Sequence, residues 1–410
     1  MKKSSFSWST VPQLNNRNRS KIKMMTNSTM ESWEELVKKQ LKTDDIYTVL
    51  QKENLEGIEL KPYYSAEGTK LSAIPGIEES TQLVADYSES LEDDVFAFLL
   101  NENVEGLEDK TVFINNLPLA EHLRPEENDR YFSLIDVFDE AKATINNQLA
   151  KELLAKDFSR KICIDISKHQ NAGAAIYQQL GIALAKTKDL VEEFGAEILN
   201  KLIIRIAVGP NYLFEIAKIR ALKMLFISFS KEYGLNEIPY VFAETTFRNK
   251  TKTDPENNLI RSTLEIAAAM IGGADAVYSN DFRLAEHSEL SREISFKQQI
   301  VLAYESIINV FADAGNGSYV IEDLTRQFSE KAWKLFLEME EAGGYLELLK
   351  KGVVQQKIYE HAVQEQKWVQ EGKIKLVGIN LYPKLDAVKN TEEMYSTSEV
   401  KPVRWSEMFE

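Results

Sequence analysis

Glu244, Arg248 and Asp254 place charged side chains in a polar stretch that directly follows a short apolar run at 238–243. In parallel α/β proteins, the loop after a strand is where chemistry usually sits. Two interpretations of the first two residues are open: they belong to a site, or they form an ion pair within the loop. We favour the ion pair of Glu244 with Arg248.

Histidine is the other residue type here that could act as a general base, and the chain has four. We interpret His169, which follows an apolar run, as a strand-end residue hydrogen-bonded to a neighbour in preference to a base. No spaced cluster of metal ligands and no glycine-rich phosphate loop is present, so no metal site is predicted. The single cysteine, Cys163, is predicted to be a buried core residue, and it excludes an internal disulfide.

The polar loop belongs to a β-loop-α-β unit. An Asp-Pro-Glu triplet at 254–256 is typical of a helix start, because an acceptor at the N-cap, proline at N1 and an acid in the first turn all suit that end. A Gly-Gly pair at 272–273 predicts the helix end, and 274–279 predicts the next strand. The predicted apolar face of the helix consists of Leu259, Ile260, Thr263, Leu264, Ala267 and Ile271.

Strand and helix patterns alternate on both sides of this unit. Such alternation indicates a parallel α/β sheet, closed or nearly closed as a barrel. Between 80 and 165 the apolar runs are short, and several spacers are too brief for a crossover helix, which needs a dozen or more residues. We therefore expect a trimmed first half. The other predicted elements are strands at 161–167 and 201–209, and helices at about 172–194, 211–234 and 291–310.

Composition limits the partners and the setting. With 410 residues the chain can hold one barrel of about 250 residues plus extensions. A net charge of −15 argues against nucleic acid and anionic membranes as partners, and no apolar run is long enough to span a membrane. A cytoplasmic setting is expected. Residues 1–29 are predicted to be a disordered tail or a wrongly assigned start, and 30–53 an amphipathic helix and turn, with Trp33, Leu36, Val37 and Leu41 on one face.

Two long segments resemble a known family. AETTFRNKTKTDPENNLIRSTLEIAAAMIGGADAV at 243–277 and DAGNGSYVIEDLTRQFSEKAWKLFLEMEEAGG at 313–344 resemble the barrel domain of methylmalonyl-CoA mutase. Within that family the chain is most similar to the small, non-catalytic chain of the bacterial heterodimer. The resemblance implies a TIM-type (β/α)8 barrel over 68–383, an N-terminal arm over 30–67 that contacts the partner chain, and a C-terminal tail over 384–410. It also implies that this chain lacks the C-terminal, flavodoxin-like cobalamin domain.

At the family's reactive positions this sequence differs from the catalytic chain. In the catalytic chain, the strand that corresponds to the apolar run at 238–243 ends in His-x-Gln-Thr-Ser-Gly. The His, Gln and Thr of that motif match Phe242, Glu244 and Thr245 here. At the end of the strand predicted over 161–167, the catalytic chain reads Gly-Tyr-His-x-Gln-Glu-Ala-Gly-Ala, whose imidazole falls on Lys168, with His169 one step out of register. In a strand, a one-residue slip turns a side chain to the opposite face. These positions are therefore interpreted as degenerate, and no catalytic residue is expected.

The resemblance implies a structural function within an isomerase. The expected function is that of the small subunit of methylmalonyl-CoA mutase, which pairs with and stabilises the catalytic large subunit in a heterodimer. The large subunit interconverts succinyl-CoA and (R)-methylmalonyl-CoA with adenosylcobalamin, and this chain is expected to bind no cofactor, since it lacks the Asp-x-His-x-x-Gly motif of the cobalt ligand. Two alternatives stay open: a mutase barrel that uses a separately encoded cobalamin domain, and a non-catalytic module that binds a CoA ester.

Overall fold

The computed structural model describes residues 30–66, 74–75, 80–88, 95–104, 107, 109–121, 130–382 and 394–410. They divide into two units, the first containing residues 30–53 and 59–66 and the second containing residues 54–58 and the remainder. The tail predicted over 1–29 lies outside the described residues, and so do the predicted domain limits at 67–68 and 383–384.

The first unit contains the helix and turn predicted over 30–53. Its helices are α2 (Met30–Leu41) and α3 (Ile46–Leu50), and the Asp45 side chain caps α3 by accepting a hydrogen bond from the Thr48 N–H. The Trp33 ring stacks on Tyr63 with centroids 5.2 Å apart. Of the predicted apolar face, Trp33 is half-buried, whereas Leu36 is exposed.

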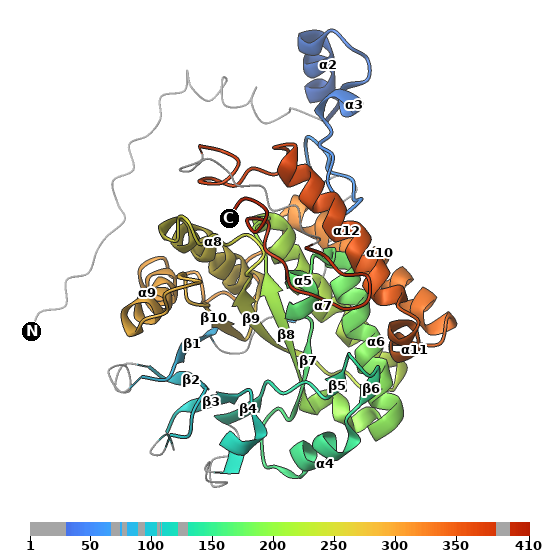
Figure 1. The fold of residues 1–410 in the computed structure, drawn as a ribbon. Coiled ribbons are helices and arrows are strands. Elements are labelled where there is room, and N and C mark those ends of the chain that lie inside the picture. Colours follow the sequence, from blue (N-terminus) through green and yellow to red (C-terminus); the bar gives the residue numbers. More distant parts are fainter. Residues whose placement is uncertain are drawn as a thin grey trace, which may run out of the picture. The chain divides into compact units, whose positions relative to one another are not determined.

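Eight parallel strands form the main sheet of the second unit, in the order β4-β3-β2-β1-β10-β9-β8-β7. Parallel bridges Phe132–Arg160 and Asp136–Cys163 connect the two end strands. The sheet is thereby nearly closed into the predicted TIM-type barrel (Figure 1), with the strands arranged in chain order around it. The strands are β1 (Gln82–Asp86), β2 (Ala97–Leu100), β3 (Thr111–Ile114), β4 (Tyr131–Ser133), β7 (Ile162–Asp165), β8 (Leu202–Val208), β9 (Tyr240–Thr245) and β10 (Ala276–Tyr278).

Among the described residues, no α-helix lies between β1 and β4, whereas an α-helix follows each strand from β7 to β10. Figure 1 shows them outside β7 to β10. Residues 87–96 and 101–110, which connect β1 to β2 and β2 to β3, are too few for a crossover helix, as predicted. A hairpin of β5 (Phe138–Asp139) and β6 (Thr144–Ile145) and helix α4 (Asn147–Ala155) lie between β4 and β7. The later helices are α5 (Ser167–Asn171), α6 (Ile176–Phe194), α7 (Tyr212–Glu232), α8 (Glu256–Gly272), α9 (Glu289–Ile300), α10 (Tyr319–Glu341), α11 (Tyr345–Lys350) and α12 (Val353–Gln370).

Two predicted boundaries need correction. Helix α6 begins at Ile176 and not near 172, because the chain turns at Gly173, whose φ of +95° and close contact with the Arg248 side chain exclude a larger residue. The helix predicted over 291–310 is α9, which ends at Ile300. A π-helical turn at Val301–Glu305 continues it.

The apolar face predicted for α8 is wrong at Ile260 and Leu264, whereas Ala267 is buried as predicted. Ile260 and Leu264 are 65% and 52% exposed, whereas Ser262 and Glu265 are fully buried. The Glu265 carboxylate is paired, since the Lys250 ammonium lies 2.7 Å from it. Because the pair is formed inside the protein, the helix can bury a polar face and leave apolar side chains outside. The helix end was predicted correctly, since Gly273 has the left-handed φ of +82°.

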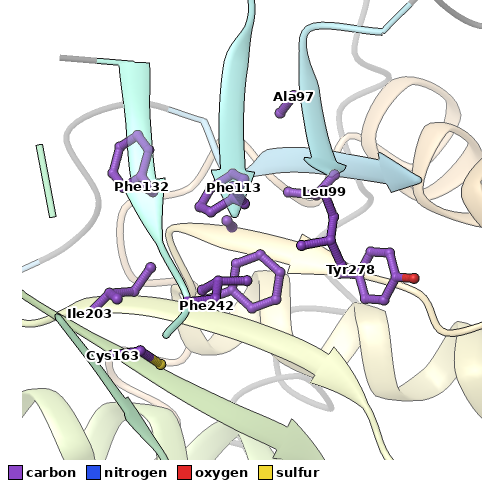
Figure 2. Packing of buried hydrophobic residues seen from close by; sticks show 11 residues of the cluster. Ala97, Leu99, Phe113, Phe132, Cys163, Ile203, Phe242 and Tyr278 are labelled. Atoms are coloured by element: carbon purple, nitrogen blue, oxygen red, sulfur yellow. The ribbon is translucent and has the colours of Figure 1, made fainter. Parts of the chain in front are cut away.

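Aromatic rings fill the barrel interior. Figure 2 shows Phe113, Phe132, Phe242 and Tyr278 directed inward from four different strands. The Phe113 ring lies 5.0 Å from both Phe132 and Phe242, measured between centroids. Cys163 is fully buried in the same cluster, as predicted. None of the helices in the described ranges is both long and apolar enough to cross a membrane.

We expect the Phe113→Ala substitution to lower the free energy of unfolding by about 3 to 5 kcal/mol, because it leaves a cavity among rings that cannot collapse into it. Denaturant titration followed by circular dichroism measures the change. The matched control is Leu337→Ala on α10, where the side chain is 46% exposed and the expected loss is below about 0.5 kcal/mol. Equal losses would show that the ring cluster is not the barrel core.

Candidate functional site

The candidate site lies at the face where the barrel strands end. Because the strands are parallel, the loops after them meet on one side of the barrel. Asn171 joins two of these loops: its side-chain oxygen accepts hydrogen bonds from the Thr246 hydroxyl at 2.8 Å and the Phe247 N–H at 2.9 Å. The segments after β7 and β9, which the sequence singled out separately, are therefore neighbours.

Phe242 lies below this face, inside the barrel. Its side chain is fully buried and packs against Phe113 and, with a centroid distance of 6.3 Å, against Tyr278. A phenyl ring carries no proton to transfer, and its neighbours are apolar. The position can therefore contribute packing but no acid–base chemistry.

Glu244 pairs with Arg205 and not with Arg248. The predicted loop ion pair is wrong, because Glu244 is the fifth residue of β9 and reaches across to β8, where Arg205 Nη2 lies 2.6 Å from its Oε2. Burial lowers the pKa of Arg205, but the charges of Glu244 and Asp165 more than offset it, so that the pKa is raised overall. Sequence reasoning missed Arg205, although a lone arginine in the apolar run LIIRIAV was a usable signal.

Arg248 connects the residues of a second buried cluster. Its guanidinium lies 2.6 Å from Glu365 of α12 and donates to the Val403 carbonyl at 2.6 Å. The Val403 N–H donates in turn to the Asn171 carbonyl, and the Trp405 N–H donates to that of Arg248. Residues 394–410 are thus bound across the loops after β7 and β9.

Lys168 and His169 lie in helix α5, not in a strand. Strand β7 ends at Asp165, and the chain turns into α5 at Ser167. The prediction that a one-residue slip reverses the side-chain direction is therefore wrong, since successive helical residues differ by about 100°. The Lys168 side chain is half exposed, 3.9 Å from Asp165, whereas His169 is fully buried.

His169 belongs to a buried polar cluster, as the interpretation of a hydrogen-bonded residue expected. Its Nε2 lies 3.3 Å from the Tyr345 hydroxyl and 3.6 Å from Glu140. The fully buried Lys186 ammonium pairs with Asp136 at 2.6 Å and lies 3.6 Å from Glu140. Burial lowers the pKa of His169 despite Glu140, so the imidazole is neutral beside the Lys186 cation.

The remaining site residues also have partners within the chain. Thr245 is buried, and its hydroxyl and carbonyl oxygens accept hydrogen bonds from Asn280 after β10. His361 Nδ1 donates to the Gly173 carbonyl at 2.6 Å, and His287 Nδ1 lies 3.1 Å from Asp281. Within the ranges that the structure describes, no three His, Cys, Asp or Glu side chains are grouped closely enough to hold a metal ion.

A nearly closed parallel barrel with a loop face of this kind defines the TIM-type class of α/β proteins. The family model of methylmalonyl-CoA mutase matches residues 150–408, which is more than half of the chain. The chain belongs to the methylmalonyl-CoA mutase family.

Individual relatives cover different parts of the chain. A methylmalonyl-CoA mutase of Rhizobium meliloti is 30% identical over 245 residues, covering 56% of this chain and 34% of that protein. The methylmalonyl-CoA mutase small subunit of Porphyromonas gingivalis is 32% identical over 231 residues, covering 53% and 37%. The large subunit from the same organism is 27% identical over 289 residues, covering 61% and 40%. This chain therefore spans 34% to 40% of the length of these relatives.

We expect Glu244→Ala to lower the free energy of unfolding by about 3 kcal/mol, because it leaves the partly buried Arg205 charge without its closest partner. Chemical denaturation at pH 7 measures the loss. Glu347→Ala is the control, since Glu347 pairs with Lys351 at the surface and its removal should cost less than about 1 kcal/mol. A loss no larger than that of the control would mean that the Arg205–Glu244 pair is not buried.

His169 should contribute a loss of stability as the pH falls from about 7 to 5. Burial depresses the pKa of His169 in the folded state, so its contribution is present above the unfolded value of about 6.5 and is lost as the pH falls below it. Denaturant titrations at several pH values measure how the free energy of unfolding depends on pH. Lowering the pH should be less destabilising for His169→Gln than for the wild-type chain. The exposed His287→Gln serves as the control and should keep the wild-type slope.

Proposed function

We propose that this chain is the small, non-catalytic subunit of a methylmalonyl-CoA mutase. In this proposal it is a degenerate barrel that pairs with and stabilises a catalytic large subunit, which interconverts succinyl-CoA and (R)-methylmalonyl-CoA in a heterodimer. The proposal rests on the residue that occupies the position where the catalytic chain has a histidine. Phe242 fills it with a buried ring among other rings.

The charges above that ring support the same proposal. A buried carboxylate that is already paired with an arginine is not available to a substrate, and Glu244 is paired with Arg205 in this way. A negatively charged carboxylate would also oppose the approach of an anionic CoA ester. Similarity to a small-subunit sequence agrees with the proposal, although large-subunit and single-chain mutases match comparable lengths of the chain.

Adenosylcobalamin is proposed to reside in the partner subunit. The described residues do not fit this cofactor: the His169 imidazole is enclosed with Tyr345 and Glu140, and His361 is bound to a backbone carbonyl. His287 is exposed, but it lies in the loop beside Asp281. Residues 394–410 lie across the loops after β7 and β9, which are part of the face that a cofactor would have to approach.

The first structural unit is proposed to act as the arm that contacts the large subunit. Its helix α2 exposes Leu36 and Leu41, which are 55% and 41% accessible. Exposed apolar side chains on a short helix are suited to bury against another protein. Under this proposal the protein works in the cytoplasm as one component of an isomerase.

The test is co-expression with the large mutase chain from the same genome, followed by size-exclusion chromatography and a mutase assay of each fraction. We expect a one-to-one complex whose activity requires the large chain. If this chain elutes alone and isomerises methylmalonyl-CoA with adenosylcobalamin and a separately supplied cobalamin domain, the catalytic alternative is correct.

A pair of matched variants separates a structural from a catalytic role within the complex. Glu244→Gln in this chain converts the position to the residue of the catalytic motif, and it should leave kcat and KM of the complex unchanged. Substitution of the large chain's own motif histidine should abolish turnover. A change of more than tenfold in kcat for Glu244→Gln would contradict the proposal.

A further inference from the structure

A groove runs along the outside of the barrel between helix α9 and strands β1 and β2. Its lower part has a volume of about 430 Å³ and contains several exposed apolar side chains. Phe96 and Tyr304 are 71% and 70% accessible, and Ile307 and Val310 are 55% and 53% accessible. Monomeric proteins seldom expose so many large apolar side chains in one place, which marks the groove as an interaction surface.

The groove exists because a helix is missing from the fold. In a complete barrel each strand is followed by a helix that covers the outer face of the sheet. Only residues 87–96 connect β1 to β2, too few for such a helix, and the side chains of α9, β1 and β2 line the groove instead. The groove is therefore the place where the helix after β1 would otherwise lie.

The upper part of the groove is acidic. Its volume is about 370 Å³, and four carboxylates and one guanidinium line it. Phe296 lines both parts, so the two parts adjoin at this side chain. The charged side chains are those of Asp86, Glu102, Glu289, Glu293 and Arg292.

The dimensions of the groove suit a helix. One face of α9 and of the following π-helical turn borders it from Glu289 to Tyr304. At 1.5 Å per residue this is about 24 Å, the length of a helix of four to five turns. An added β-strand is excluded as the occupant, because β1 is already paired with β2 on one side and β10 on the other.

We propose that this groove binds an amphipathic helix of the large subunit, with apolar side chains in the lower part and lysine or arginine side chains at the acidic upper part. The inference rests on the function proposed above. The charge decides between occupants: a second copy of this chain, with a net charge of −15, would be repelled by the acidic end, whereas a basic helix end would be attracted. The trimmed barrel would thus receive from its partner the helix that it lacks.

Alkylation of an introduced thiol tests the proposal on the full chain. Cys163 is fully buried, and burial raises the pKa of its thiol, so a cysteine introduced at the surface is the thiol of this chain that reacts. For Tyr304→Cys we expect the large subunit to slow alkylation at least tenfold, measured by mass spectrometry of this chain. Leu337→Cys on α10 is the control and should react at the same rate with and without the large subunit.

Affinity measurements complete the test. Ile307→Lys and the double variant Glu102→Lys with Glu289→Lys should each raise the Kd for the large subunit at least tenfold, and the double variant should also weaken its salt dependence. Leu337→Lys should leave the Kd unchanged. If a complex forms but Tyr304→Cys stays reactive, this inference fails and the proposed function stands.

Two other outcomes overturn the inference in different ways. If no complex forms with the large subunit, the inference and the proposed function fail together. If the Tyr304→Cys thiol is already protected in the isolated chain, the groove is occupied from within. Protection that grows with the concentration of the isolated chain would instead assign the groove to a second copy.

Discussion

An eight-stranded barrel encloses an interior that side chains must fill, and in this protein apolar rings fill it. Phe113 contacts rings from two other strands, and Phe242 occupies the level just below the loop face. Because protein interiors are close-packed, such an interior supports the strands and leaves little space for a reactant. The remaining features of the chain depend on this interior, which is filled by packed rings and not by reactive groups.

The charges at the loop face follow a second physical rule. Transferring an ion from water into a protein costs several kcal/mol unless a partner offsets it. Lys186 and Arg248 are buried against carboxylates, and Arg205 is partly buried against one. Arg248 also holds the described C-terminal segment. The polar groups that mark this face as a candidate site are therefore already engaged in holding the fold together.

The interior and the exterior of the barrel show opposite tendencies. Inside, the rings are packed and the charges are matched, whereas outside β1 and β2 the absence of a crossover helix leaves apolar side chains accessible. A molecule with this distribution is better suited to contact another protein than to enclose a small substrate. This contrast connects the proposed subunit role with the proposed groove.

The sequence by itself determined the local elements and the family. The helix over 212–232, the stop at Gly273 and the short connections of the first half follow from patterns that neighbouring residues create. Only the tertiary structure decided the partners of Glu244 and Arg248, the outward face of α8, and the position of His169 in a helix. Arg248 meets Glu365, 117 residues away, and no local pattern encodes such a distance. Hydrophobic periodicity reports which residues can be buried, but the pairing of buried charges depends on which elements the closed barrel brings together.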